Sequence, residues 1–277
     1  MIHLESLEMR VPVADGDPYP FTVQAVRQLG ELRFDRPVTF FVGENGSGKS
    51  TLLEGIAAAT HLPTVGAQHI DHDRTLRHAR DLGKRLRLRW RHRTHHGFFL
   101  RAEDFFGFTK SLATQRVEFE QELARIEVEY ADRSAHAKAL ARGPAASSLR
   151  DMTNRYGEDL DANSHGQSFL KLFQSRLVPD GVFLLDEPEA PLSPQSILAL
   201  MAMIGEAVEQ GAQFIIATHS PILLAFPGAT IISFDDGAIR TVPFAELDHV
   251  NLTRDFLNDP SRYLRHLFTT ANAEPLS

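Results

Sequence analysis

The stretch Val38-Thr39-Phe40-Phe41-Val42, followed by Gly43-Glu44-Asn45-Gly46-Ser47-Gly48-Lys49-Ser50-Thr51, decides the fold of this chain. The first five residues are β-branched or aromatic and predict a strand, and residues 52–59 after the stretch favour a helix. The segment between them spells G-x-x-x-x-G-K-[ST], in which glycines let backbone N–H groups turn inward around an anion. The order strand, loop, helix therefore predicts a site for the phosphates of a nucleoside triphosphate.

Two side chains at the end of this loop have expected roles. Lys49 would reach the β- and γ-phosphates, and the Ser50 hydroxyl would ligate Mg²⁺. The helix that begins near Lys49 adds the positive end of its dipole. The simpler interpretation is a Gly/Ser turn that contains a lysine. It is disfavoured, because the fixed positions would occur by chance in roughly one chain in a hundred of this size.

Composition indicates a folded protein of the α/β class. With 277 residues, 43% of them hydrophobic, the chain can bury a full core as one large domain or as one domain with a subdomain. No apolar run approaches the ~20 residues of a membrane helix, and the N-terminus lacks a basic region followed by an apolar one, so we expect a soluble, cytoplasmic protein. The absence of cysteine excludes disulfides, thiolate metal sites and cysteine nucleophiles.

Basic residues are concentrated in one segment, although the net charge is −7. Residues 74–93 contain nine Lys or Arg and one acid. Within them, alternation places Arg87, Arg89, Arg91 and Arg93 on one face of a predicted strand, and Leu86, Leu88 and Trp90 on the other. Two interpretations stay open: a solvated outer face, whose arginines pair with the protein's own acids such as those between Glu118 and Glu129, or a surface that contacts nucleic acid.

The rest of the first half divides into strands and a helical segment. The first ~40 residues predict short strands of an antiparallel layer, and Phe98–Arg101 predicts a further strand. From about residue 105 to 141, apolar residues at helical spacing predict a packed helical subdomain rather than a coiled-coil arm. The run Gly143–Ser148 predicts a flexible loop that ends this helix.

Two later strands end in residues suited to phosphate chemistry. Val182–Glu187 is an apolar run that ends in Asp186 and Glu187, and the carboxyl ends of parallel strands are where ligands bind in α/β sheets. Such an Asp can hold Mg²⁺, and the next carboxylate can orient or deprotonate water. A second buried run, Gln213–Ala217, leads to His219, which is either a γ-phosphate contact or a hydrogen-bonded structural histidine.

Between the phosphate loop and these strands, Asn163-Ser164-His165-Gly166-Gln167-Ser168 precedes a helical run. Small polar residues and glycine at a helix start suit an anion, although a simple N-cap explains them as well. With this segment, the order of motifs resembles the ABC-class ATPases over residues 38–221. More narrowly, the phosphate loop, Gly97–Glu103, Ser164–Gln167, Asp186–Ala190 and Asp255–Pro260 resemble small bacterial ATPases of the SMC and recombination-repair branch.

The resemblance implies a head-to-tail homodimer that closes around two ATP molecules with Mg²⁺. Phosphates and metal would be held by Lys49, Ser50 and Thr51, with Asp186 supporting the metal. Glu187 would be the general base, and His219 would sense the γ-phosphate. The partner's ATP would be met by Ser164, Gly166 and Gln167.

Some positions depart from the family pattern. Glu103 stands where the family has a glutamine that couples the helical subdomain to the metal, and we keep it as a candidate metal contact. His165 replaces the first glycine of the signature, and Ser193 stands where many transporter subunits have an aspartate. Phe21 is the candidate for stacking on adenine.

We therefore expect a P-loop NTPase of α/β class, with a mixed, largely parallel core sheet, an antiparallel β layer and an inserted helical subdomain. Residues 1–104 and 169–277 would form the nucleotide-binding lobe, and residues 105–168 the helical subdomain with the signature motif.

The expected function is Mg²⁺-dependent ATP hydrolysis that drives homodimerisation, with nucleic acid as a candidate substrate. The alternative is the ATP-binding subunit of a membrane transporter. It is disfavoured because Asp186–Ala190 differs from the transporter-like Asp-Glu-Pro-Thr-Ser. A kinase or GTPase is disfavoured because no acceptor pocket or N-K-x-D motif is visible in the sequence.

Overall fold

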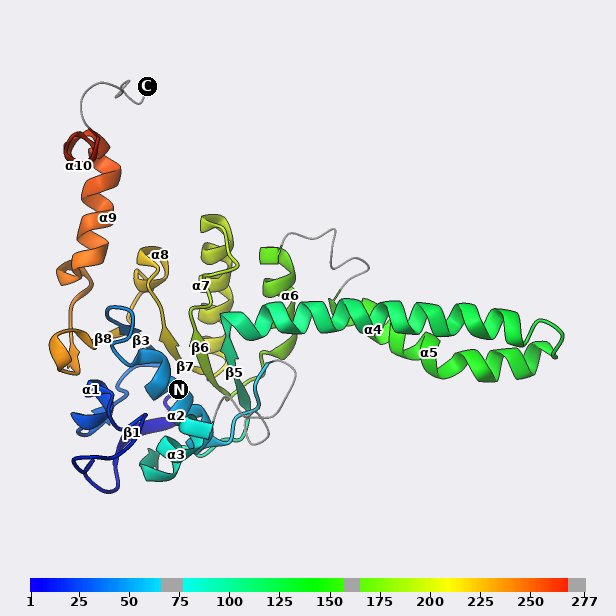
Figure 1. Cartoon of the computed structure of the whole chain (residues 1–277), viewed down its shortest axis with the longest axis horizontal. Coiled ribbons are helices and arrows are strands. Elements are labelled where there is room, and N and C mark those ends of the chain that lie inside the picture. The colour runs from blue at the N-terminus through cyan, green and yellow to red at the C-terminus, as the bar shows by residue number, and fades with distance from the viewer. Residues whose placement is uncertain (66–76, 157–164, 269–277) are drawn as a thin grey trace.

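The computed structural model describes residues 1–65, 77–156 and 165–268, and it contains two sheets surrounded by helices (Figure 1). The larger sheet has the strand order β5-β6-β7-β3-β8-β9. Its strands are β3 (Val38–Val42), β5 (Gly97–Arg101), β6 (Val182–Asp186), β7 (Gln213–Ala217), β8 (Thr230–Ser233) and β9 (Arg240–Thr241). Neighbours from β5 to β8 pair in parallel, and β9 is antiparallel to β8. The predicted mixed, largely parallel core sheet is confirmed.

The smaller sheet is the predicted antiparallel layer. It consists of β1 (Leu4–Met9), β2 (Leu32–Arg33) and β4 (Leu86–Trp90), in the order β2-β1-β4. The basic strand is β4, which pairs with β1, and β1 pairs with β2 on its other side; both pairings are antiparallel. The strand after it, β5, joins the larger sheet because its apolar residues need cover on both faces.

Alternation along the strands of the larger sheet supplies two separate apolar cores. Phe41 packs towards α2 (Lys49–Thr60) and the smaller sheet, whereas its neighbour Phe40 packs towards α6 (His165–Arg176) and α7 (Pro194–Glu209). Both phenylalanines are fully buried. Burying such a side chain is worth roughly 1.5–3 kcal/mol, so cover on both faces fixes the strands and the loops at their carboxyl ends.

The remaining helices are short and lie around this framework. The α-helices are α1 (Gln24–Arg27), α3 (Arg77–Arg85), α8 (Pro221–Leu224), α9 (Asp248–Asn258) and α10 (Pro260–Leu267), and the 3₁₀ turns are η2 (Asp235–Gly237) and η3 (Phe244–Glu246). Figure 1 shows α9 and α10 rising away from the sheets towards the C-terminus. Among the described residues, no helix is both long and apolar enough to cross a membrane.

A helical hairpin is the most extended part of the molecule. Its two helices, α4 (Ala102–Glu129) and α5 (Ala135–Tyr156), project together away from the sheets (Figure 1). At 1.5 Å per residue the 28 residues of α4 span about 42 Å. Glu127 near the end of α4 forms ion pairs with Lys138 and Arg142 of α5. The inserted helical subdomain is thus an extended arm, and the interpretation of its apolar stripe as compact packing is wrong.

The predicted break of this helix is also displaced. The turn lies at residues 130–134, where the Ser134 hydroxyl accepts from the Ala137 N–H at 3.2 Å. The run Gly143–Ser148, predicted as a flexible loop, lies inside α5, with Pro144 within the helix. Packing against α4 buries Ala145, and such tertiary contacts outweigh the local helix-breaking tendency.

Candidate functional site

The phosphate loop has the backbone that its motif predicts. It leaves the larger sheet at the end of β3 and enters α2 at Lys49. Gly43 and Gly48 have φ of 144° and 104°, which side chains rarely tolerate. A Cβ at Gly48 would lie 2.6 Å from Val23 Cγ1, and one at Gly43 would lie 3.0 Å from Asp235 Oδ1. The loop therefore needs glycine at these two positions for conformation and for space.

Lys49 holds a positive charge inside this loop. Its side chain is buried, with the residue 5% exposed, and Nζ donates to the carbonyl oxygens of Gly43 at 2.7 Å and Glu44 at 2.9 Å. Burial lowers the pKa of Lys49, and the nearby carboxylates of Glu187 and Asp186 oppose that shift. Carbonyl groups orient the ammonium group without neutralising it, so its charge stays available to an anion.

A hydroxyl and a carboxylate meet where the loop passes the end of β6. Ser50 Oγ donates to Asp186 Oδ1 at 3.0 Å, although 136 positions separate them in sequence. Burial raises the pKa of Asp186 to about 6, and the Ser50 hydrogen bond lowers it. These two oxygen donors fit Mg²⁺, which is usually bound by one or two protein groups together with phosphates and water. Among the described residues, no cluster of three His, Cys, Asp or Glu side chains offers a cage made of protein alone.

The next two predicted residues lie at the ends of adjacent strands. Glu187 follows β6 and His219 follows β7, and Glu187 Oε1 lies 3.9 Å from His219 Nε2. Glu187 has a left-handed backbone, with φ of 50°, and its N–H donates to the Ala217 carbonyl at 2.9 Å. The bond continues the pairing of β6 with β7 by one residue, and the left-handed backbone of Glu187 then turns the chain out of the strand direction. The structure thus brings Lys49, Ser50, Asp186, Glu187 and His219 to one edge of the sheet.

Glu189 is a contact that our sequence reasoning missed. Its Oε1 accepts from the Thr218 hydroxyl at 2.6 Å and from the His219 backbone N–H at 2.8 Å. A single carboxylate oxygen therefore ties the turn after β6 to the turn that carries His219. The sequence does not show that β6 and β7 are adjacent. Without that information, the contact between Glu189 and the turn after β7 cannot be predicted.

A cleft of about 750 Å³ opens beside the phosphate loop and is lined by Gly43–Ser47, His219, Asp235 and His249. Asp235 Oδ1 accepts from the Glu44 N–H at 2.8 Å and so holds the loop. Burial lowers the pKa of His249, and His219 nearby lowers it further. Ser47 Oγ and the Nε2 atoms of both histidines are buried without a hydrogen bond in the described part of the chain. A cleft with such polar atoms beside Lys49 fits the phosphates of a nucleotide.

The described residues of the predicted signature motif lie at the start of α6. Gly166 and Gln167 begin α6, and a Cβ at Gly166 would lie 3.3 Å from the Pro191 carbonyl oxygen and from Ser196 Oγ. This position is beside the turn after β6. Ser164 and the side chain of Glu103 fall outside the described residues.

Ser193 and Phe21 both have structural roles in the fold. Ser193 caps α7, since its hydroxyl accepts from the Ser196 N–H at 3.2 Å. Phe21 is 4% exposed within the core, and the Arg85 guanidinium lies 3.9 Å from its ring centroid, so it cannot stack on adenine as proposed. Tyr19 is instead 47% exposed, and its hydroxyl lies 3.3 Å from Thr51 Oγ1 in the phosphate loop.

Comparison with known families gives two matches. An AAA domain matches residues 22–134, and a family described as "AAA domain, putative AbiEii toxin, Type IV TA system" matches residues 167–225. No curated protein sequence is detectably similar to the chain.

Solved structures with a similar fold include an ATP-binding cassette of an ABC transporter, at 18% identity and a TM-score of 0.48, covering 96% of this chain and 99% of that one. Another is the Smc head domain of Pyrococcus furiosus with an extended coiled coil, bound to the C-terminal domain of ScpA, at 13% identity and a TM-score of 0.46, covering 94% and 100%.

The family matches fall on the parts of the chain that build the site. The first range contains the phosphate loop after β3, and the second contains Asp186, Glu187 and His219. The chain is therefore similar to AAA domains over both of these ranges.

Proposed function

We propose that the chain binds ATP together with Mg²⁺ and hydrolyses it to ADP and phosphate. The observation that carries this proposal is the 3.0 Å contact between Ser50 and Asp186, beside Lys49 and next to the Glu187–His219 pair. The phosphate-binding residues would be Gly43, Glu44, Asn45, Gly46, Ser47, Gly48, Lys49, Ser50 and Thr51. Backbone N–H groups of the loop, the start of α2 and the Lys49 ammonium would together offset the phosphate charge.

In the proposed mechanism, each residue of the sheet edge has one role. Ser50 and Asp186 would hold the metal, which neutralises charge on the β- and γ-phosphate oxygens when bound. Glu187 would accept the proton of the attacking water, and His219 would donate to the γ-phosphate through the ring nitrogen that lacks a hydrogen bond. Glu189 would keep the His219 turn in position.

We further propose that ATP closes two chains head to tail. Gly166 and Gln167 lie beside the turn after β6, and with Ser164 they would meet the ATP held by the other subunit. The lobes would be residues 1–104 with 169–277, and the helical subdomain residues 105–168. The arm formed by α4 and α5 leaves the sheet from the end of β5, so a movement at the nucleotide would be carried outward along the arm. Glu103, at the base of α4, is the proposed link between arm and metal.

The process driven by this cycle would be mechanical or switching work, with nucleic acid as the proposed substrate. The projecting arm supports it, because an extended lever suits displacement of a large partner. Membrane transport is the weaker candidate, since Asp186–Ala190 differs from the transporter pattern.

A complementation experiment tests the composite site. Lys49→Ala removes the phosphate-binding half and Ser164→Arg blocks the signature half, so each variant alone should be inactive. Mixing them should restore one working site per mixed dimer, at up to about half of the parent rate per dimer. Mixed dimers that form, as shown by differently tagged chains, but stay inactive would exclude the in-trans role.

A further inference from the structure

A second pocket lies at the opposite end of α2 from the phosphate loop. It has a volume of about 490 Å³ and lies between α2, α3 and the smaller sheet. Ala58 and Ala59 in the last turn of α2, and His61 directly after that helix, line the pocket, whereas the phosphate loop precedes the first turn. The 12 residues of this helix span about 18 Å, so the two sites are separate.

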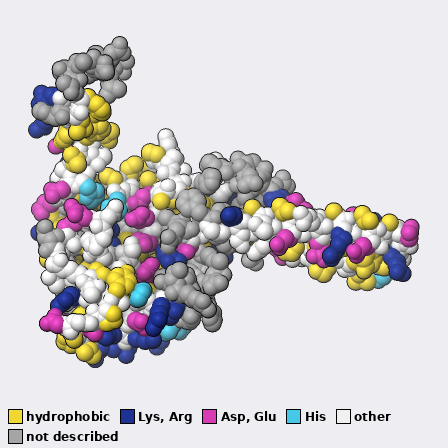
Figure 2. Space-filling model, viewed as in Figure 1, with side chains coloured by type: hydrophobic (Ala, Val, Ile, Leu, Met, Phe, Trp, Pro, Cys, Tyr) yellow, Lys and Arg dark blue, Asp and Glu magenta, His cyan; other side chains and the backbone are white. Residues whose placement is uncertain are grey.

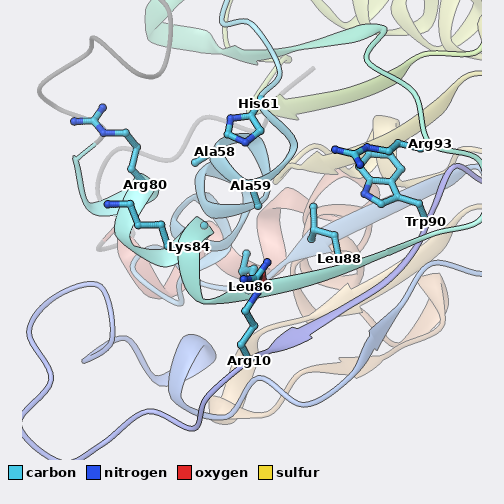
Figure 3. Close-up of a pocket in the computed structure, with 11 residues that line it drawn as sticks. Arg10, Ala58, Ala59, His61, Arg80, Lys84, Leu86, Leu88, Trp90 and Arg93 are labelled. Atoms are coloured by element: carbon cyan, nitrogen blue, oxygen red, sulfur yellow. Dashed lines mark hydrogen bonds between the residues drawn. The ribbon is translucent and has the colours of Figure 1, made fainter.

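The floor and the rim of this pocket differ in chemistry. Figure 3 shows an apolar floor, with the alanines of α2 and Leu88 of β4 beside Trp90. Around it stand Arg80 and Lys84 from α3, Arg10 after β1, and Arg93 after β4. No Asp or Glu is among the described residues that line the pocket, although the whole chain carries a charge of −7.

Two arginines of the rim, Arg10 and Arg93, are not paired with a carboxylate among the described residues. Arg10 Nε donates to the Leu86 carbonyl at 3.0 Å, which fixes the guanidinium without neutralising it. Arg93 is exposed and has no partner among the residues that the structure describes. Lys84 contacts Asp81 at 3.4 Å, which removes part of one charge. The end of α2 contributes about half a negative charge, and the two arginines alone outweigh it.

The same face of the molecule is basic beyond the pocket. Figure 2 shows Lys and Arg side chains gathered at the lower end of the view, where Figure 1 places α3. An anion approaching this end would meet a positive potential, unlike the acidic average of the chain.

We infer that this pocket binds a nucleotide unit, with the base against Trp90 and the phosphate on Arg93, which lies at the same end of β4 as Trp90. Arg10 lies at the other end of that strand and adds to the positive potential of the rim. An aromatic floor and a basic rim match a ligand that is flat and apolar at one end and anionic at the other. Bases stack on aromatic side chains for about 1–3 kcal/mol, and arginine binds phosphate through paired N–H groups. The volume is within the ~300–1,000 Å³ of sites for small ligands. The unit belongs either to a free nucleotide or to a single strand of nucleic acid.

If the ligand is a single strand, this inference rests on the proposed action on nucleic acid and deepens it. If the ligand is a free nucleotide, the inference stands by itself. It does not depend on ATP hydrolysis. The two can fail separately, because the test uses full-length Lys49→Ala chain, in which the phosphate loop should hold no nucleotide.

Trp90 is the one tryptophan of the chain, so its fluorescence reports this pocket alone. We would titrate Lys49→Ala chain with dTMP, with the single strand (dT)₆ and with tripolyphosphate. Quenching that saturates with dTMP identifies a free nucleotide as a sufficient ligand, and quenching by (dT)₆ alone identifies a strand. No quenching by either, or equal quenching by tripolyphosphate, overturns the inference.

A charge reversal in the rim is the second arm of the test. Arg93→Glu should raise the half-saturating concentration about tenfold or more, because a charge-assisted contact becomes a repulsion. With (dT)₆, Arg93→Glu should also weaken the salt dependence: the magnitude of the negative slope of log K against log salt should decrease by about 1. The matched control is Arg133→Glu at the exposed tip of the arm, which makes the same charge change far along the hairpin. If both variants titrate alike, the pocket does not hold the phosphate. Unchanged far-UV circular dichroism shows that each variant is folded.

Discussion

The phosphate loop and the arginine strand both place cations beside a sheet, but the cations differ in burial and in the groups that they contact. At the loop, Lys49 is buried and bonded to two backbone carbonyls. Arg87 on β4 and Arg91 directly after it are exposed, and they lie 3.2 Å and 3.0 Å from carboxylate oxygens of Glu8 and Glu5 on β1. A further pair joins Arg89 to Glu31 at 3.9 Å.

The difference concerns which charges remain free for a ligand. A cation that is desolvated and bonded to carbonyls keeps its charge, and its burial is costly until an anion arrives. A cation opposite a carboxylate on the neighbouring strand is already neutralised and solvated. The structure therefore favours the phosphate loop as an anion site over the paired arginines Arg87, Arg89 and Arg91.

Removal of Lys49 should have the largest effect. Lys49→Ala deletes the buried cation, so we expect ATP binding to be lost, as measured with a fluorescent ATP analogue. The matched control is Lys110→Ala, because Lys110 is exposed on α4 and its substitution removes the same charge. Retained ATP affinity in Lys49→Ala would show that the buried ammonium is not what binds phosphate.

Removal of the proposed base should slow hydrolysis and leave binding intact. Glu187→Gln keeps the side-chain shape but cannot accept a proton, so the rate should fall by about 10²–10⁴. ATP should stay bound, and the variant should accumulate as a dimer when ATP and Mg²⁺ are present. Light scattering of the protein as it elutes from a sizing column measures the molar mass. Glu209→Gln is the control, since Glu209 is exposed at the end of α7 and does not line the cleft. Hydrolysis at the parent rate in Glu187→Gln would end this assignment.

The carboxylate of Glu189 should matter through position. Glu189→Ala removes the acceptor of the Thr218 hydroxyl and of the His219 N–H, and hydrogen bonds to a charged group are worth about 1.5–3 kcal/mol. We expect kcat to fall by about tenfold or more while ATP affinity changes little. Glu189→Gln keeps one acceptor oxygen and should recover part of kcat. If Glu189→Ala lowers ATP affinity and kcat equally, Glu189 supports the whole fold and not the His219 turn.

Sequence reasoning succeeded where local signals and long-range packing agree. The runs that became β3, β6 and β7 are mostly apolar, and the structure buries every residue of them, as strands covered on both faces require. The phosphate loop has fixed backbone geometry, so its motif alone predicted its position.

It failed where distant partners decide the outcome. Pro144 lies within α5, which packs along α4, and Phe21 is held under the Arg85 guanidinium. The acids that pair with β4 come from β1 and Glu31, not from the helix at 118–129. Asp235 and His249 reach the cleft from segments without a motif, so only the folded chain brings them to the loop.

The arginine strand should give the smallest effect and the sharpest test of the comparison. Replacing Arg87, Arg89 and Arg91 by Gln removes three surface ion pairs with β1 and Glu31. Exposed pairs such as those of Arg87 and Arg91 contribute about 0.2–1 kcal/mol each, so Tm should fall by about 1–5 °C. The decrease should shrink in high salt, because screening weakens these pairs.

Nucleic-acid affinity separates the two accounts of this strand. If the arginines serve the fold, the triple variant should bind single strands across a salt series as the parent does, whereas Arg93→Glu at the pocket should not. If instead the triple variant loses affinity and its salt dependence flattens with Tm unchanged, these arginines contact phosphates directly. In that case, arginines that are paired with carboxylates still bind an anion. The proposed difference between the phosphate loop and the arginine strand would then be wrong.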